Sequence, residues 1–117
     1  MKDFLFLIFN ELGHKFYRQG TLIDEIEPLA FFTYWNIEQS DEYADNSPKT
    51  LKNIYQVYFY CQEIMLLENP NYLYDEMDKF VARARELGLA VASVQDIASS
   101  PDKYIGRMCR VSYAQHE

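Results

Sequence analysis

The sequence predicts an α+β fold in which a mainly antiparallel sheet of four to five strands carries two packed helices. Two segments, 31–36 and 54–61, are dense in aromatic and β-branched residues and too short for typical helices. Two others, 2–17 and 70–87, repeat apolar residues at helical spacing. At 117 residues the chain suits a single domain, 1–117, whose core needs no metal or disulfide.

The first expected helix spans residues 2–17. Its apolar stripe consists of Phe4, Leu5, Ile8 and Leu12. Phe6, Leu7 and Phe9 widen that stripe almost all round the first turns, so we expect the sheet and another subunit to cover the helix. Gly13 lies inside the pattern and leaves the end of the helix open. Residues 22–29 fit either a short edge strand or a loop.

The aromatic segments predict two neighbouring strands, 29–36 and 52–61, the second at the centre of the sheet. In the first, alternation places Phe31, Thr33 and Trp35 on one face and the residues between them on the other. Both faces are aromatic, so both are expected to be covered at least in part. Three large residues are expected in the core: Trp35, Phe59 and Phe80.

The second helix has clear end signals. Asn69 can cap it, Pro70 suits its first position and Gly88 ends it. Residues 62–69 before it are ambiguous. A strand at 89–94 and a last strand at 104–113 follow, the latter with Cys109, Val111 and Tyr113 facing inward.

A long acidic loop, residues 38–50, joins the two aromatic strands. Its carboxylates are Glu38, Asp41, Glu42 and Asp45. Neither their spacing nor a central glycine matches a calcium loop, so we interpret the segment as a solvated surface loop. It is longer than a hairpin needs, and long loops in assemblies often reach a neighbouring subunit.

The net charge of −7 argues against sequence-specific binding to nucleic acid and against an anionic membrane surface. The apolar run 4–9 is too short for a signal peptide, and no run approaches a membrane span, so we expect a protein made in the cytoplasm. Cys61 and Cys109 are expected to be buried, reduced thiols.

The sequence contains no catalytic signature. Its four glycines form no phosphate-binding pattern and no serine lies in a nucleophile elbow. Nothing brings Cys61 or Cys109 together with His14 as a nucleophile and base. With His14 and His116 as the only histidines, ligands for zinc are too few. We therefore expect no enzyme, no cofactor and no metal, and we expect Arg107 and Arg110 to pair with nearby acids.

Three features together resemble a known family. They are the strand 31–36 after a short turn, the aromatic strand 55–60, and the terminal Gly106-Arg107 followed by Val111 and Tyr113. They resemble small neck or tail proteins of tailed phages and prophages of Gram-positive bacteria. The order of elements is also similar to the tail-terminator and tail-completion fold of long-tailed phages.

The resemblance implies an assembly function in the virion, after assembly in the bacterial cytoplasm. It implies a ring of identical subunits, commonly a hexamer, that caps the tail tube and contacts tail-tube and head-connector proteins. Head-closure and other minor tail roles stay open, as does a small acidic inhibitor of a host factor. The expected subunit interface consists of Phe6, Phe9, Asp41, Glu42, Asp45, Tyr58 and Tyr60.

Overall fold

The computed structural model describes residues 2–19, 28–37, 50–97 and 103–116. Residues 38–49 of the expected loop 38–50 and most of the stretch 22–29 lie outside these ranges, whereas Thr50 begins a strand. In chain order the elements are α1 (Lys2–Leu12), β1 (Lys15–Arg18), β2 (Ala30–Ile37), β3 (Thr50–Gln62), α2 (Met65–Glu68), α3 (Tyr72–Glu86), β4 (Ala90–Asp96) and β5 (Tyr104–His116).

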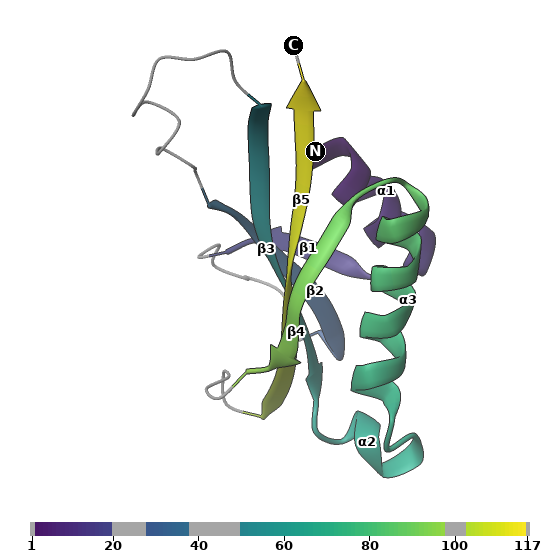
Figure 1. Ribbon diagram of the computed structural model, residues 1–117. Coiled ribbons are helices and arrows are strands. Elements are labelled where there is room, and N and C mark those ends of the chain that lie inside the picture. Colours follow the sequence, from purple (N-terminus) through teal and green to yellow (C-terminus); the bar gives the residue numbers. More distant parts are fainter. Residues whose placement is uncertain (1, 20–27, 38–49, 98–102, 117) are drawn as a thin grey trace.

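The strands form one five-stranded sheet in the order β1-β2-β3-β5-β4 (Figure 1). The pairs β2–β3, β3–β5 and β4–β5 are antiparallel, whereas β1 runs parallel to β2. The α+β class is therefore confirmed, as is the central position of β3. The sheet is mixed because β1 lies where the sequence predicted the end of a helix.

Gly13 is the reason that the first helix ends early. It adopts a φ of 77°, a left-handed conformation that glycine tolerates and that closes a helix. The chain then turns back, and Phe16 of β1 packs on α1 with ring centroids 4.9 Å from Phe6 and 5.1 Å from Phe9. The prediction of a helix to residue 17 is wrong because this turn lets Phe16 reach the core.

The long helix α3 begins at Tyr72, two residues later than Pro70 would place it. Asn69 accepts the backbone N–H of Asn71 at 3.2 Å, so it caps the turn before the helix. Gly88, with a φ of 87°, follows the end of α3 as predicted. The ambiguous stretch 62–69 contains the four-residue helix α2.

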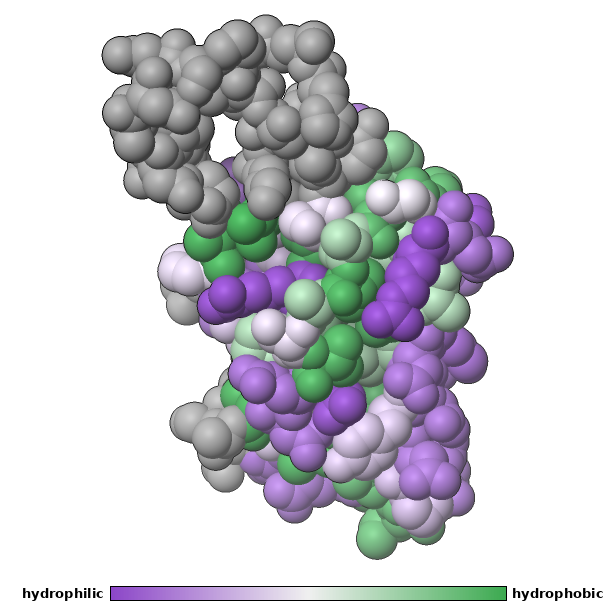
Figure 2. Space-filling view, in the orientation of Figure 1, coloured by the Kyte–Doolittle hydropathy of each residue, from purple (hydrophilic) through white to green (hydrophobic). Residues whose placement is uncertain are grey.

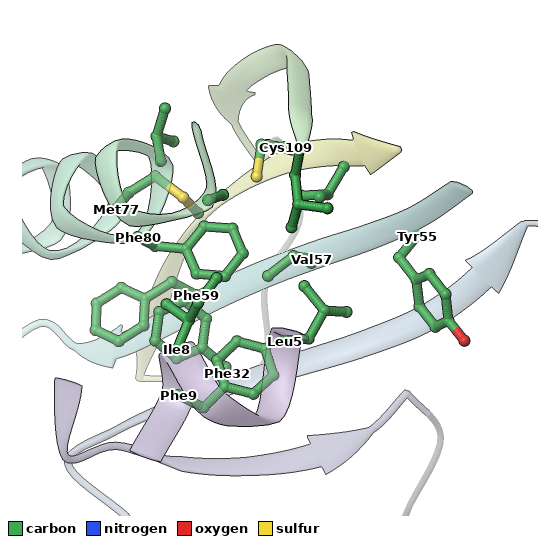
Figure 3. Packing of buried hydrophobic residues seen from close by; sticks show 14 of the residues in the cluster. Leu5, Ile8, Phe9, Phe32, Tyr55, Val57, Phe59, Met77, Phe80 and Cys109 are labelled. Atoms are coloured by element: carbon green, nitrogen blue, oxygen red, sulfur yellow. The ribbon is translucent and has the colours of Figure 1, made fainter. Parts of the chain in front are cut away.

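The helices α1 and α3 cover one face of the sheet (Figure 1), and the core lies between the two layers (Figure 3). The strands contribute alternate residues to it, as period-2 alternation requires. Its fully buried large side chains are Leu5, Ile8, Phe9, Phe32, Val57, Phe59, Met77, Phe80 and Val111. The rings of Phe9, Phe32 and Phe80 lie within 4.6–5.8 Å of one another.

Phe59 and Phe80 are buried as predicted, but Trp35 is 48% exposed and does not belong to the core. It lies with Phe31 and Thr33 on the opposite face of β2 from Phe32, which confirms the predicted alternation. The prediction for Trp35 is wrong because no described helix covers that face. Cys109 and Val111 point inward on β5 as predicted, and the side chain of Tyr113 lies outside the description.

Candidate functional site

The helix-free face of the sheet is the side chains of the strands that point away from α1 and α3. The registers align two rows of side chains across β2, β3 and β5. One row is Trp35–Gln56–Arg110 and the other is Thr33–Tyr58–Met108. Figure 2 shows hydrophilic residues gathered along the α3 side of the molecule, and hydrophobic and hydrophilic residues mixed over the strands.

Hydrogen bonds fix the orientation of Gln56 at the centre of this face. Its Oε1 accepts the indole N–H of Trp35 at 3.0 Å and the hydroxyl of Tyr58 at 2.8 Å. Because an indole nitrogen can only donate, it requires the amide oxygen of Gln56 and excludes the amide nitrogen. The two N–H donors of Gln56 are therefore directed elsewhere.

Arg110 is the register partner of Gln56 on β5, and it is exposed. Residues directly opposite in a sheet have Cβ atoms about 4.5–5.5 Å apart, so the guanidinium and the Gln56 amide lie within reach of one ligand. Arg107 pairs with Asp96 at 2.6 Å, as predicted. In the described ranges, by contrast, Arg110 has no ion pair, so the expectation that it pairs with an acid is not met there.

The other end of the helix-free face is closed by its own side chains. Phe31 and Tyr60 are buried there, with ring centroids 5.2 Å apart. Gly106 lies under Tyr60, and a Cβ at this position would come within 2.9 Å of the tyrosine ring and 2.7 Å of Ile97. The exposed part of this face is therefore the end that carries Trp35, Gln56 and Arg110.

Charge is unevenly distributed along the chain. Of its 18 acidic and 11 basic residues, nine acids and ten bases lie in the described ranges, where the net charge is +1. The remaining positions hold nine acids and one base, a net charge of −8. Among the described strand residues of the helix-free face there is no aspartate or glutamate. This face is thus poor in acids in a protein that is acidic overall.

A second polar cluster lies on the helix side of the sheet. Glu76, only 8% exposed, accepts hydrogen bonds from His14 Nε2 and Lys79 Nζ, each at 2.7 Å. Burial alone would raise the pKa of Glu76, but the hydrogen bonds from Lys79 and His14 outweigh it and lower that pKa. The His14 ring packs against Phe59 at 5.0 Å.

This cluster has the polar partners of a catalytic dyad but no adjacent nucleophile in the described ranges. Neither thiol hydrogen-bonds to His14. Burial raises the pKa of the Cys61 thiol to about 11 and that of Cys109 to about 12, so both are protonated at neutral pH. The free, buried thiols agree with the prediction for both cysteines. The arrangement of His14, Glu76 and Lys79 suits a connection between α3 and the turn after α1.

The residues of the expected interface differ in their surroundings. Phe9 is fully buried, so it has no surface for a partner in this conformation and does not fit that expectation. Phe6 is partly buried against Phe16 and Tyr34. On the helix-free face Tyr58 is partly exposed and Tyr60 is 6% exposed. Asp41, Glu42 and Asp45 lie outside the described residues.

Sequence reasoning did not single out Gln56 or make Arg110 a binding residue. Strand alternation alone could place each of them on the face opposite the core. Their alignment with Trp35 depends on the strand order and the register between β2, β3 and β5, and the sequence does not specify either.

None of the helices described is long and apolar enough to cross a membrane. Within the described ranges, no group of three or more His, Cys, Asp and Glu residues could hold a metal ion. No protein-family model matches the sequence, and a search of curated proteins gives no match either.

Proposed function

We propose that this protein is a structural subunit of a tailed phage, a tail-terminator, tail-completion or head–tail joining protein that forms a ring at the tail–neck junction. The proposal combines the resemblance of the sequence to neck and tail proteins with an α+β fold whose elements follow the expected order of a helix, strands, a helix and strands. Its activity is assembly, with no catalytic step.

The observation that carries the proposal is the helix-free face. Helices cover one side of the sheet, while the other side exposes Trp35 by 48% and leaves Tyr58 and Met108 partly exposed. An aromatic sheet face that no described helix covers favours contact with another protein surface, where Trp, Tyr, Met and Arg are enriched.

The ends of β3 and β5 support the same proposal. Residues 50–53 pair with 113–116, but β2 ends opposite Ile54 and β4 begins opposite Ser112. The two strands therefore project together beyond the rest of the sheet (Figure 1). A two-stranded ribbon is marginally stable alone, and its open edges can pair with a neighbour. Identical subunits joined through unlike surfaces close into a ring when the rotation between them allows it.

The test is assembly on the tail tube. Light scattering gives the mass of the purified protein, and electron microscopy shows whether it binds the ends of tubes made from the tail-tube protein of the same genome. We expect a ring, formed alone or only on the tube. A strict monomer at high concentration that also leaves the tube ends bare would refute the proposal and favour the acidic inhibitor of a host factor.

A further inference from the structure

We propose that the row Trp35–Gln56–Arg110 is a carboxylate-binding site that receives the acidic segment 38–49 of a neighbouring subunit. This inference rests on the proposed function for its biological setting, because it assigns the joint between subunits of the ring. The binding site itself is argued from the chemistry of the row and of the segment.

The row presents hydrogen-bond donors. Oε1 of Gln56 is occupied by Trp35 and Tyr58, so the amide offers its two N–H groups. Arg110 lies opposite on β5 and adds a guanidinium that has no ion pair in the described part of the chain. An arginine fork and an amide N–H side by side match the oxygens of a carboxylate. The strand residues around them on this face provide no competing acid.

The segment supplies the complementary charge. Residues 38–49 contain four carboxylates, Glu38, Asp41, Glu42 and Asp45, and a single base. The segment joins the end of β2 at Ile37 to the start of β3 at Thr50, so both its ends are attached at the end of the sheet where Trp35 lies. At about 3.3 Å per residue, six residues out and six back span at most roughly 20 Å, far enough to reach an adjacent copy.

The row is open in the single chain, where Arg110 is exposed and Trp35 is 48% exposed. Each subunit then carries one donor segment and one acceptor row. In a ring the joint is heterologous, because each subunit gives its segment to one neighbour and receives a segment from the other. Such a joint generates a closed ring without any symmetric contact.

A synthetic peptide with the sequence of residues 38–49 tests the site directly. Trp35 is the only tryptophan, so its emission reports occupancy of the row, and anisotropy of a labelled peptide measures affinity independently. We expect Arg110→Glu to weaken binding at least about tenfold, because it replaces a charge-assisted bond by repulsion. The matched control is Arg85→Glu, an exposed arginine on α3 whose reversal makes the same change in net charge and leaves binding nearly unchanged.

Three results would overturn the assignment. In the first, the peptide does not bind the parent protein at millimolar concentration. In the second, Arg110→Glu and Arg85→Glu weaken peptide binding equally. In the third, the peptide binds only a variant in which an Asn-Gly turn replaces residues 38–49. The last would place the segment on its own chain. Arginine-dependent peptide binding without assembly on tail tubes would retain the site and reject the phage function. Assembly on tail tubes that Arg110→Glu leaves unchanged would retain the phage function and reject the carboxylate-binding site.

Mixing two variants tests the exchange between subunits. One variant is Arg110→Glu, which reverses the charge of the acceptor row. The other changes Asp41, Glu42 and Asp45 to lysine, which reverses the charge of the donor segment. Each alone should fail to form the parent oligomer. An equal mixture should form rings in which the two variants alternate, because one joint is unchanged and the next pairs the lysines with the introduced glutamate. Both sets of changes in one chain should restore ring assembly. A mixture that stays monomeric would contradict the proposed joint.

Discussion

His14 and Glu76 are 62 positions apart in sequence and 2.7 Å apart in space. Because a carboxylate only accepts, His14 Nε2 carries the proton of this hydrogen bond. The bond connects the residue after Gly13, where the chain leaves α1, to the buried side of α3. It therefore holds together two elements that cover the same face of the sheet.

The first prediction concerns the stability that this contact provides. His14→Ala leaves the carboxylate of Glu76 buried with Lys79 as its remaining partner, and we expect a loss of about 1.5–3 kcal/mol in the free energy of unfolding. Urea denaturation at pH 7 measures it. Lys79→Ala is the control and should have a smaller effect, since the lysine side chain is 61% exposed. Equal losses in the two variants would show that the histidine contact is no stronger than a surface pair.

The second prediction is the pH dependence of the same contact. The pKa of Glu76 is lowered on folding, so near that pKa the unfolded chain binds more protons than the folded protein. Its contribution is thus present above the ordinary carboxyl pKa and is lost as the pH falls through the lower, folded value. The stability difference between the parent and Glu76→Gln should be largest near neutral pH and shrink below about pH 4.5. A difference that is constant or grows toward acid pH would contradict this assignment.

The third prediction separates the two faces of the sheet. Phe59→Ala and Phe80→Ala remove fully buried rings and should each cost about 3–5 kcal/mol. Trp35→Ala removes a ring that is half exposed and one hydrogen bond, so its cost should be closer to about 1–2 kcal/mol. Thermal or urea unfolding of the three variants gives the ranking. A loss for Trp35→Ala as large as for Phe59→Ala would mean that the helix-free face is covered in the folded subunit.

Much of this fold could be predicted because its signals are local. The alternation within β2 and β3 identified both strands and the residues on each face, and Gly88 marked the end of α3. The turn at Gly13 could not be located, because glycine is tolerated inside a helix as well as after one. Its position is decided by the contacts of Phe16 with Phe6 and Phe9, which are tertiary.

The candidate site was less predictable than the fold. A half-buried strand and a fully buried strand look alike when both faces are aromatic, so the sequence pattern wrongly predicts Trp35 in the core. Whether a face is covered depends on where the helices pack, and that is decided by the whole apolar surface of the chain. Gln56 and Arg110 can be recognised as parts of one site only from the strand register that aligns them with Trp35.

The fourth prediction is that both thiols are inert in the folded protein. Cys61 and Cys109 are fully buried, and burial raises the pKa of these thiols to about 11 and 12, so little thiolate exists at neutral pH. Iodoacetamide at pH 7.5 should label neither residue within hours in the native protein and both after denaturation, as measured by mass spectrometry. Rapid labelling of one cysteine in native buffer would indicate local opening of the strand that carries it.

The fifth prediction tests how Trp35 orients Gln56. Trp35→Phe keeps an aromatic ring but removes the indole N–H, which is the group that requires the amide oxygen. The hydroxyl of Tyr58 can donate or accept, so it permits either orientation of the amide, and the N–H groups beside Arg110 are then present only part of the time. We expect a change in stability below about 1 kcal/mol and a several-fold weaker affinity for the 38–49 peptide, a smaller loss than with Arg110→Glu.

The matched variant for this test is Tyr58→Phe. It removes the other donor to Gln56 but leaves the indole, so the amide keeps its orientation and the affinity for the peptide should fall less than with Trp35→Phe. The side-chain amide signals of Gln56 in ¹⁵N-resolved spectra give a readout that a loss of packing alone would not change. They should shift and broaden in Trp35→Phe and stay sharp in Tyr58→Phe. If the two variants bind the peptide equally well, the indole does not position Gln56. In that case the charge of Arg110 alone accounts for carboxylate binding at the row.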